Sequence, residues 1–143
     1  MSVKQISVFI ENKKGRLIAV TSCLAENEVN IRALSVADTS DFGILRLIVD
    51  QPNHACRALK EAGFTVRETD VLALEVADAP GGINTGLVVL ERSGINVDYI
   101  YAFLSVEKGK ALNILKVDKM EAATRALNEA GLRLLDGEEV YGR

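Results

Sequence analysis

Two asparagines at matching positions have the chemistry to bind a small polar ligand. Asn30 lies in the stretch Glu28-Val29-Asn30-Ile31, and Asn96 lies in the stretch Gly94-Ile95-Asn96-Val97. A carboxamide carries donors and acceptors, so it can contact either charged group of such a ligand. Asparagine also tolerates left-handed backbone, and each residue could therefore be only a turn residue.

A glycine-containing loop precedes the first predicted helix of each half of the chain. The loops are Asn12-Lys13-Lys14-Gly15 and Asp78-Ala79-Pro80-Gly81-Gly82. Unpaired N–H groups at a helix N-terminus suit a carboxylate, and glycine lets that backbone approach closely. Asp78 could accept an ammonium or could serve only the turn. The basic residues of the first loop are either a solvated cluster or a second carboxylate contact: Lys13, Lys14 and Arg16.

Catalytic and metal-binding patterns are missing from the sequence. The single histidine, His54, is expected on the surface, and Cys23 and Cys56 are expected to be small buried thiols. No phosphate-binding loop, metal-ligand cluster or nucleophile motif occurs. We therefore predict a protein that is not an enzyme and that carries neither a cofactor nor a metal.

The composition is that of an ordinary globular protein. Hydrophobic residues make up 48% and charged residues 26% of the 143 residues, and the net charge is −3. A nucleic-acid-binding protein usually shows a clustered basic surface, so no nucleic-acid partner is expected. No apolar run approaches the roughly 18 residues of a membrane span, and no signal-peptide core is visible, so we expect no membrane association and a cytoplasmic location.

The chain contains an internal repeat that spans nearly its whole length. At an offset of 66 residues Asn30 matches Asn96. At an offset of 68 residues, 57–63 matches 125–131, and a hairpin can absorb the two-residue difference. Further matches connect Gly15 with Gly81, Gly43 with Gly109, and Asp50 with Asp118. We infer one small domain written twice, with domains at 1–69 and 70–143.

Hydrophobic periodicity predicts the order β-α-β-β-α-β in each half. In the first strand Ile6, Val8 and Ile10 alternate with Gln5 and Ser7, which are expected on the exposed side. A first helix follows from the spacing of Leu17, Val20 and Leu24. The expected strands of the first half are 3–10, 31–36, 44–49 and 64–67, and its second helix runs from Pro52 to Gly63.

The second half is expected to repeat this order. Gly86 lies inside its first helix, where close packing against the sheet would compensate for the cost. Asp118 and Glu121 have the spacing of a capping box. The expected strands are 71–76, 97–106, 110–117 and 132–135, with Val140 as a further strand residue. Because Glu68-Thr69-Asp70 is the only connection between the halves, we expect a bend near Thr69 and no independent tumbling.

These features indicate an α+β fold of two ferredoxin-like units, each an antiparallel sheet with both helices on one face. The second unit resembles the ACT domain through Asp78-Ala79-Pro80-Gly81, an apolar helix and Gly94-Ile95-Asn96-Val97. In the first unit the loop lacks the proline, and Glu28 replaces the glycine. The resemblance covers essentially the whole chain, and the segment 96–103 also looks like that of small stand-alone tandem ACT proteins.

The resemblance implies a non-catalytic regulatory protein that binds a free amino acid at an interface between ACT domains. It also implies that contacts come from the loop before the first helix of one domain and from the start of the second strand of another. The residues expected to bind the ligand are Asn12, Lys14, Gly15, Arg16, Leu17, Asn30, Ile31, Asp78, Pro80, Gly81, Gly82, Ile83, Asn96 and Val97.

Other functions compete with this one. The chain could be an oligomerisation or interaction subunit of an amino-acid-metabolising enzyme without ligand binding, and the looser first loop favours this alternative. A homodimer with a continuous sheet is plausible. RNA binding would need exposed aromatic residues on the central strands, and a metal carrier would need a C-x-x-C loop. Tyr99 and Tyr101 share one strand face and could pack in a core or interface, or cover the ligand.

Overall fold

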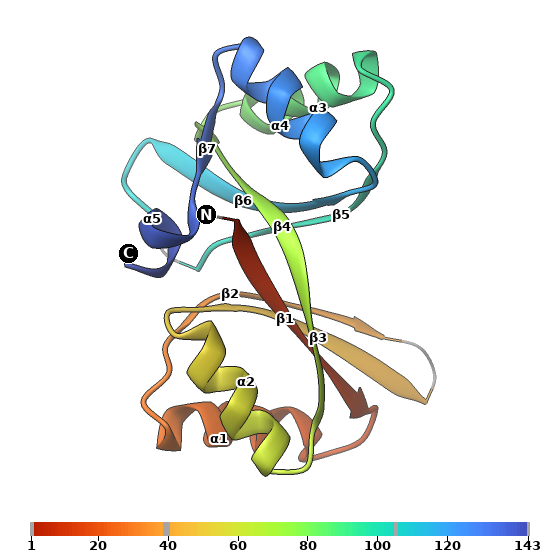
Figure 1. The fold of residues 1–143 in the computed structure, drawn as a ribbon, viewed down its shortest axis with the longest axis vertical. Helices are drawn as coiled ribbons and strands as arrows, with labels where there is room; N and C mark the ends of the chain where they lie inside the picture. The colour runs from red at the N-terminus through yellow and green to blue at the C-terminus, as the bar shows by residue number, and fades with distance from the viewer. Residues whose placement is uncertain (1, 39–40, 105, 143) are drawn as a thin grey trace. The chain divides into compact units, whose positions relative to one another are not determined.

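The chain folds into two compact units. The computed structural model describes residues 2–38, 41–104 and 106–142. The N-terminal unit is Lys4–Thr69 with Tyr141, and the C-terminal unit is Asp70–Val140 with Ser2 and Val3. Each unit is an antiparallel sheet covered on one face by two helices (Figure 1), which confirms the predicted α+β fold class.

The N-terminal unit has the strand order β2-β3-β1-β4, in which β4 contributes its first residues. Helices α1 and α2 lie on the same face of this sheet (Figure 1). Ile6, Leu45, Val20 and Leu59 are fully buried members of the core between the sheet and the helices. Its elements are β1 (Val3–Glu11), α1 (Arg16–Glu26), β2 (Ile31–Asp38), β3 (Phe42–Val49), α2 (Pro52–Glu61) and the start of β4 (Thr65–Ala77).

The C-terminal unit has the order β5-β6-β4, with β7 pairing on β4. Helices α3 and α4 cover one face of this sheet (Figure 1). Leu74, Leu90, Leu115 and Leu127 belong to its core. Besides the second part of β4, its elements are α3 (Gly82–Arg92), β5 (Val97–Ala102), β6 (Lys110–Val117), α4 (Met120–Glu129), β7 (Arg133–Leu135) and α5 (Gly137–Tyr141).

The prediction of two separate strands on either side of Glu68-Thr69-Asp70 is wrong, because β4 is one strand of 13 residues from Thr65 to Ala77. The connection Glu68-Thr69-Asp70 contains neither glycine nor proline, so nothing in it interrupts extended backbone. The β-branched residues around it, Val66 and Val71 among them, favour a strand.

Three smaller expectations also differ from the structure. Val140 belongs to α5 rather than to a strand, because Asp136 and Glu139 form a capping box that starts a helix. The Glu139 N–H donates to Asp136 Oδ1 at 2.9 Å, and the Asp136 N–H donates to Glu139 Oε1 at 3.3 Å. Gln5 and Ser7 are buried rather than exposed, and Gln5 Nε2 donates to Ser7 Oγ at 3.2 Å.

The apolar face of α1 is narrower than its spacing predicts. Val20 and Leu24 are buried, but Leu17 is 43% exposed and Ile18 is 66% exposed. The first turn of α1 therefore leaves apolar side chains uncovered beside the loop that precedes it.

The close approach predicted at Gly86 is present. A Cβ at Gly86 would lie 2.6 Å from Leu74 Cδ2, so a larger residue would displace that leucine. Leu74 is paired in register with Asn113 on β6, and Asn113 is 4% exposed. The Asn113 Nδ2 atom has no hydrogen-bond partner among the described residues. An unpaired buried amide destabilises the fold.

We predict that Asn113→Leu stabilises the protein, since Leu45 occupies the matching position of the N-terminal unit and is fully buried there. The expected gain is about 1 kcal/mol, at the lower end of the cost of an unsatisfied buried group. Urea denaturation measures it. The reverse change Leu45→Asn should destabilise by more than this gain, and a loss of stability in Asn113→Leu would contradict the assignment.

Candidate functional site

The two junction asparagines are held by the same pair of backbone contacts. In the N-terminal unit the Asn30 N–H donates to Asp50 Oδ1 at 2.9 Å, and the Asp50 N–H donates to the Asn30 carbonyl at 3.1 Å. In the C-terminal unit Asn96 and Asp118 make the same two bonds, also at 2.9 and 3.1 Å. We call each arrangement a junction clamp. It ties the start of the second strand to the end of the third.

The turn interpretation of the asparagines is wrong at the backbone level. The left-handed residue at each junction is two positions earlier, at Glu28 with φ 57° and at Gly94 with φ 71°. Among described residues other than glycine, Glu28 alone has positive φ, so neither Asn30 nor Asn96 needs that conformation. The Glu28 carbonyl accepts from Gln51 Nε2 at 3.1 Å, and the Gly94 carbonyl accepts from Lys119 Nζ at 3.2 Å.

The capping box predicted at Asp118 and Glu121 is also wrong. Helix α4 has Lys119 at its N-cap position, and no side chain caps it. The Asp118 carboxylate is instead used in the junction clamp to Asn96.

The side chains of the two asparagines differ in their surroundings. Asn96 Nδ2 donates to Asp98 Oδ1 at 2.9 Å, and Asp98 Oδ2 lies 3.6 Å from Lys116 Nζ. Arg32 occupies the position that matches Asp98. The exposed Asn30 side chain makes no hydrogen bond with the residues that the structure describes. Asn30 therefore has the freer carboxamide.

Both predicted loops end in a left-handed glycine at a helix N-cap. Gly15 has φ 88° before α1, and Gly81 has φ 85° before α3. The N–H of the first helical residue donates to a loop carbonyl, from Arg16 to Lys13 at 3.3 Å and from Gly82 to Ala79 at 3.0 Å. No side chain caps either helix, which leaves the N–H groups of the following residues, Leu17 and Ile83, available to a ligand. A Cβ at Gly82 would lie 2.0 Å from the Ala77 carbonyl oxygen, so glycine is required there.

The predicted loop residues are mostly exposed. In the first loop the Arg16 guanidinium lies over the Phe64 ring at 5.6 Å, and Lys13 Nζ lies 3.3 Å from Glu11 Oε2. Leu17 and Ile83 occupy matching positions on α1 and α3, and each is 43% exposed. Asn12, Lys14, Asp78 and Pro80 are exposed, whereas Ile31 and Val97 are half-buried.

Within one unit the two kinds of predicted site residue lie at opposite ends of the sheet. In the N-terminal unit Glu11, before the loop, is paired with Phe42 at one end of β3. Ile31, after Asn30, is paired with Val49 at the other end. At about 3.3 Å per residue these ends are roughly 20 Å apart. In the C-terminal unit Ala77 is paired with Lys110 and Val97 with Val117. One small ligand therefore cannot contact both elements of a single unit.

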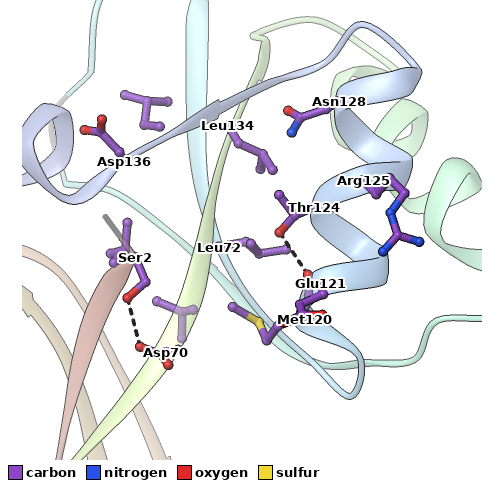
Figure 2. Close-up of a pocket in the computed structure, with 13 residues that line it drawn as sticks. Ser2, Asp70, Leu72, Met120, Glu121, Thr124, Arg125, Asn128, Leu134 and Asp136 are labelled. Carbon is purple, nitrogen blue, oxygen red and sulfur yellow. Dashed lines mark hydrogen bonds between the residues drawn. The ribbon is translucent and has the colours of Figure 1, made fainter.

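A cavity of about 800 Å³ lies elsewhere in the C-terminal unit, between β4, α4 and β7 (Figure 2). None of the predicted site residues lines it, and sequence reasoning missed it. Its one sequence signal is the capping-box spacing of Asp136 and Glu139, which ends the final strand of the second repeat. The lining residues are Ser2, Val3, Asp70, Val71, Leu72, Met120, Glu121, Thr124, Arg125, Asn128, Leu134, Leu135 and Asp136.

The histidine, the two cysteines and the two tyrosines considered in the sequence analysis contact other residues of the fold. His54 is half-buried, and its Nε2 lies 3.1 Å from the Asn27 carbonyl oxygen. Burial raises the pKa of the Cys23 thiol. Burial and then a hydrogen bond with Glu68 raise the pKa of the Cys56 thiol to about 11. Tyr99 and Tyr101 stack with ring centroids 6.4 Å apart.

The described residues form neither a metal-binding cluster nor a membrane-spanning helix. No group of three or more His, Cys, Asp or Glu side chains in the described ranges is placed to hold a metal ion. No helix in the part of the chain that the structure describes is long and apolar enough to cross a membrane.

Comparison with known proteins points to one family. The sequence model described as an ACT domain pair matches residues 1–141. Protein BT0572 of Bacteroides thetaiotaomicron is 36% identical, with a TM-score of 0.94 over 100% of this chain and 98% of that one. The ligand-free regulatory subunit of aspartate kinase from Thermus thermophilus is similar in fold, at 19% identity and a TM-score of 0.66, covering 91% of this chain and 93% of that one. No curated protein matches the sequence.

We predict that Asp50→Ala and Asp118→Ala each destabilise the protein by about 1 kcal/mol, because each leaves an asparagine N–H without its carboxylate acceptor. Asp50→Asn and Asp118→Asn keep an acceptor oxygen and should recover most of the loss. Urea denaturation measures the differences, with the exposed Asp38→Ala as control. Stability equal to that control would contradict the clamp.

The Cys56 thiol gives a prediction for alkaline pH. Its folded-state pKa of about 11 exceeds the unfolded value of about 8.5. The folded state favours the neutral thiol, so this contribution is complete below the unfolded pKa and is lost as the pH rises through about 11. The urea midpoint should fall less steeply over this range in Cys56→Ala than in the wild type. If the urea midpoints of the wild type and Cys56→Ala fall in parallel with pH, the Cys56 thiol does not contribute to the pH dependence of stability.

Proposed function

Since this chain belongs to the ACT domain pair family, we propose that it is a regulatory protein that binds a free amino acid and catalyses no reaction. The ligand would contact the loop before the first helix of one ACT unit and the start of the second strand of another. The two units can come from one chain or from two copies of it.

The observation that carries this proposal is the separation of the two elements within each unit. Each sheet presents a glycine-capped helix start at one end and a clamped asparagine at the other, roughly 20 Å away. A lone unit offers only half of a site to a molecule as small as an amino acid. Two units are needed to combine the halves.

The chemistry of the halves suits a zwitterion. The N–H groups of Leu17 and Ile83, in the first turns of α1 and α3, have no side-chain cap, lie at the positive end of a helix dipole and can receive a carboxylate. Carboxamides and carboxylates can receive an ammonium group, and Asn30 and Asp78 are exposed. Gly82 keeps the second loop close to Ala77, which positions these N–H groups.

Ligand binding would act on a partner through a population shift. A ligand that binds one arrangement of the units stabilises it by RT ln(1 + [L]/Kd). The structural neighbours include regulatory subunits of aspartate kinase that this chain matches over nearly their full length. We therefore propose an enzyme of amino-acid metabolism as the partner.

A second candidate function is an interaction subunit that has lost its ligand. The Asn96 carboxamide is already bonded to Asp98, and the first loop lacks the proline found in the second. Co-purification of an enzyme whose affinity does not change with any amino acid would favour this alternative.

We predict that one or a few of the twenty amino acids raise the melting temperature at millimolar concentration, because a ligand that binds only the folded state stabilises it. Differential scanning fluorimetry of the full chain measures the effect. If no amino acid changes the melting temperature of the folded protein, the proposal that the protein binds an amino acid is contradicted.

Substituting Asn30 by Ala should lower the affinity for the stabilising amino acid about tenfold. This is the loss expected when a hydrogen bond to a charged group is removed. Asn96→Ala should weaken it less, because the Asn96 side chain is engaged with Asp98. Calorimetric titration gives both affinities, and denaturation midpoints check that both variants fold. Unchanged affinity in Asn30→Ala would place the site elsewhere.

A further inference from the structure

The cavity between β4, α4 and β7 exists because the second repeat departs from the first at its final strand. In the N-terminal unit the chain continues along β4 through Glu68, whose side chain makes a hydrogen bond with Cys56 on α2. In the C-terminal unit β7 ends at Leu135, and the matching residue Asp136 caps α5 instead. The matching helix residue, Thr124, is left beside an open space (Figure 2).

The interior of this cavity is apolar with a few polar groups. Figure 2 shows Thr124 and Asn128 projecting from α4 toward Leu134, with Leu72 below them and Met120 at the start of the helix. Leu72 is buried, while Leu134 and Met120 are half-buried. A volume of about 800 Å³ is ample for a small organic molecule.

The charged residues around the cavity are mostly acidic. Asp70, Glu121 and Asp136 line it, against the single basic residue Arg125. Arg125 points away from Leu134 and Leu72 (Figure 2). Glu121 makes no ion pair with the residues that the structure describes, so its carboxylate is available at the start of α4.

The matching helix of the first repeat, α2, lacks the acidic residue found at Glu121. The positions of α2 that match Glu121 and Asn128 are Asn53 and Lys60, and Arg125 is matched by Arg57. These three positions therefore have a net charge of 0 on α4 and +2 on α2, because α4 has one fewer basic residue and one additional acidic residue. The cavity and the charge change occur together in one unit.

We propose that this cavity is a binding site for a small organic cation, an amine with an aliphatic or aromatic body. The body lies against Leu72, Met120 and Leu134. The ammonium group lies at the acidic rim formed by Glu121 and Asp70, where Asp70 already accepts a hydrogen bond from the Ser2 hydroxyl at 3.1 Å. The site is independent of the amino-acid site proposed above and shares no residue with it.

Titration of the isotope-labelled full chain with two probes of matched size tests the proposal. The probes are phenethylamine and 3-phenylpropionate, which differ in the sign of their charge. Phenethylamine should shift the backbone amide resonances of Leu72, Thr124 and Leu134 and saturate at millimolar concentration. The carboxylate should leave them in place.

Substitution of the rim carboxylate Glu121 tests its role in binding, and substitution of Glu129 is the matched control. Glu121→Gln should lower the affinity for phenethylamine about two- to fivefold, which is the effect of losing one exposed charge pair. Glu129→Gln, on the same helix but outside the cavity, should not. Equal responses to both probes, shifts confined to other parts of the chain, or unchanged affinity in Glu121→Gln would each overturn the proposal.

Discussion

The antiparallel register of each sheet is the constraint on which the rest of this structure depends. Pairing of Glu11 with Phe42 and of Ile31 with Val49 places the first loop and the second strand's start at opposite ends of the N-terminal unit. The junction clamp then holds the strand start through the neighbouring Asp50. A single unit therefore cannot bring these two elements together.

The two units have similar backbone folds but differ in the side chains around the junction clamp. The clamp has the same distances in both units, yet Asn96 is engaged with Asp98 whereas the position matching Asp98 is Arg32. At the fourth strand the copies diverge in backbone as well, since β7 is short and leads into α5. The clamp is therefore the same in both units, while the side chains around it differ.

Sequence periodicity predicted the fold class and the order of elements except for the single strand β4 and the final helix α5, because turns and apolar alternation are local signals. The prediction from sequence was wrong where a side chain bonds to a residue that is distant in the sequence. Asp118 has capping-box spacing, but its carboxylate bonds to Asn96, 22 residues earlier. The predicted loop and junction residues lie where expected along the chain, while the cavity beside α4 was missed. That cavity arises from the path of the chain after Leu135, which is marked in the sequence only by the capping-box spacing of Asp136 and Glu139.

The central claim is that one amino acid contacts a helix-start loop and a clamped asparagine from different units. Backbone amide shifts of the labelled full chain, followed during titration with the amino acid that stabilises it, test this claim most directly. The account predicts that a loop glycine, Gly15 or Gly81, and an asparagine, Asn30 or Asn96, shift together with one dissociation constant. Shifts confined to one end of one unit would contradict it.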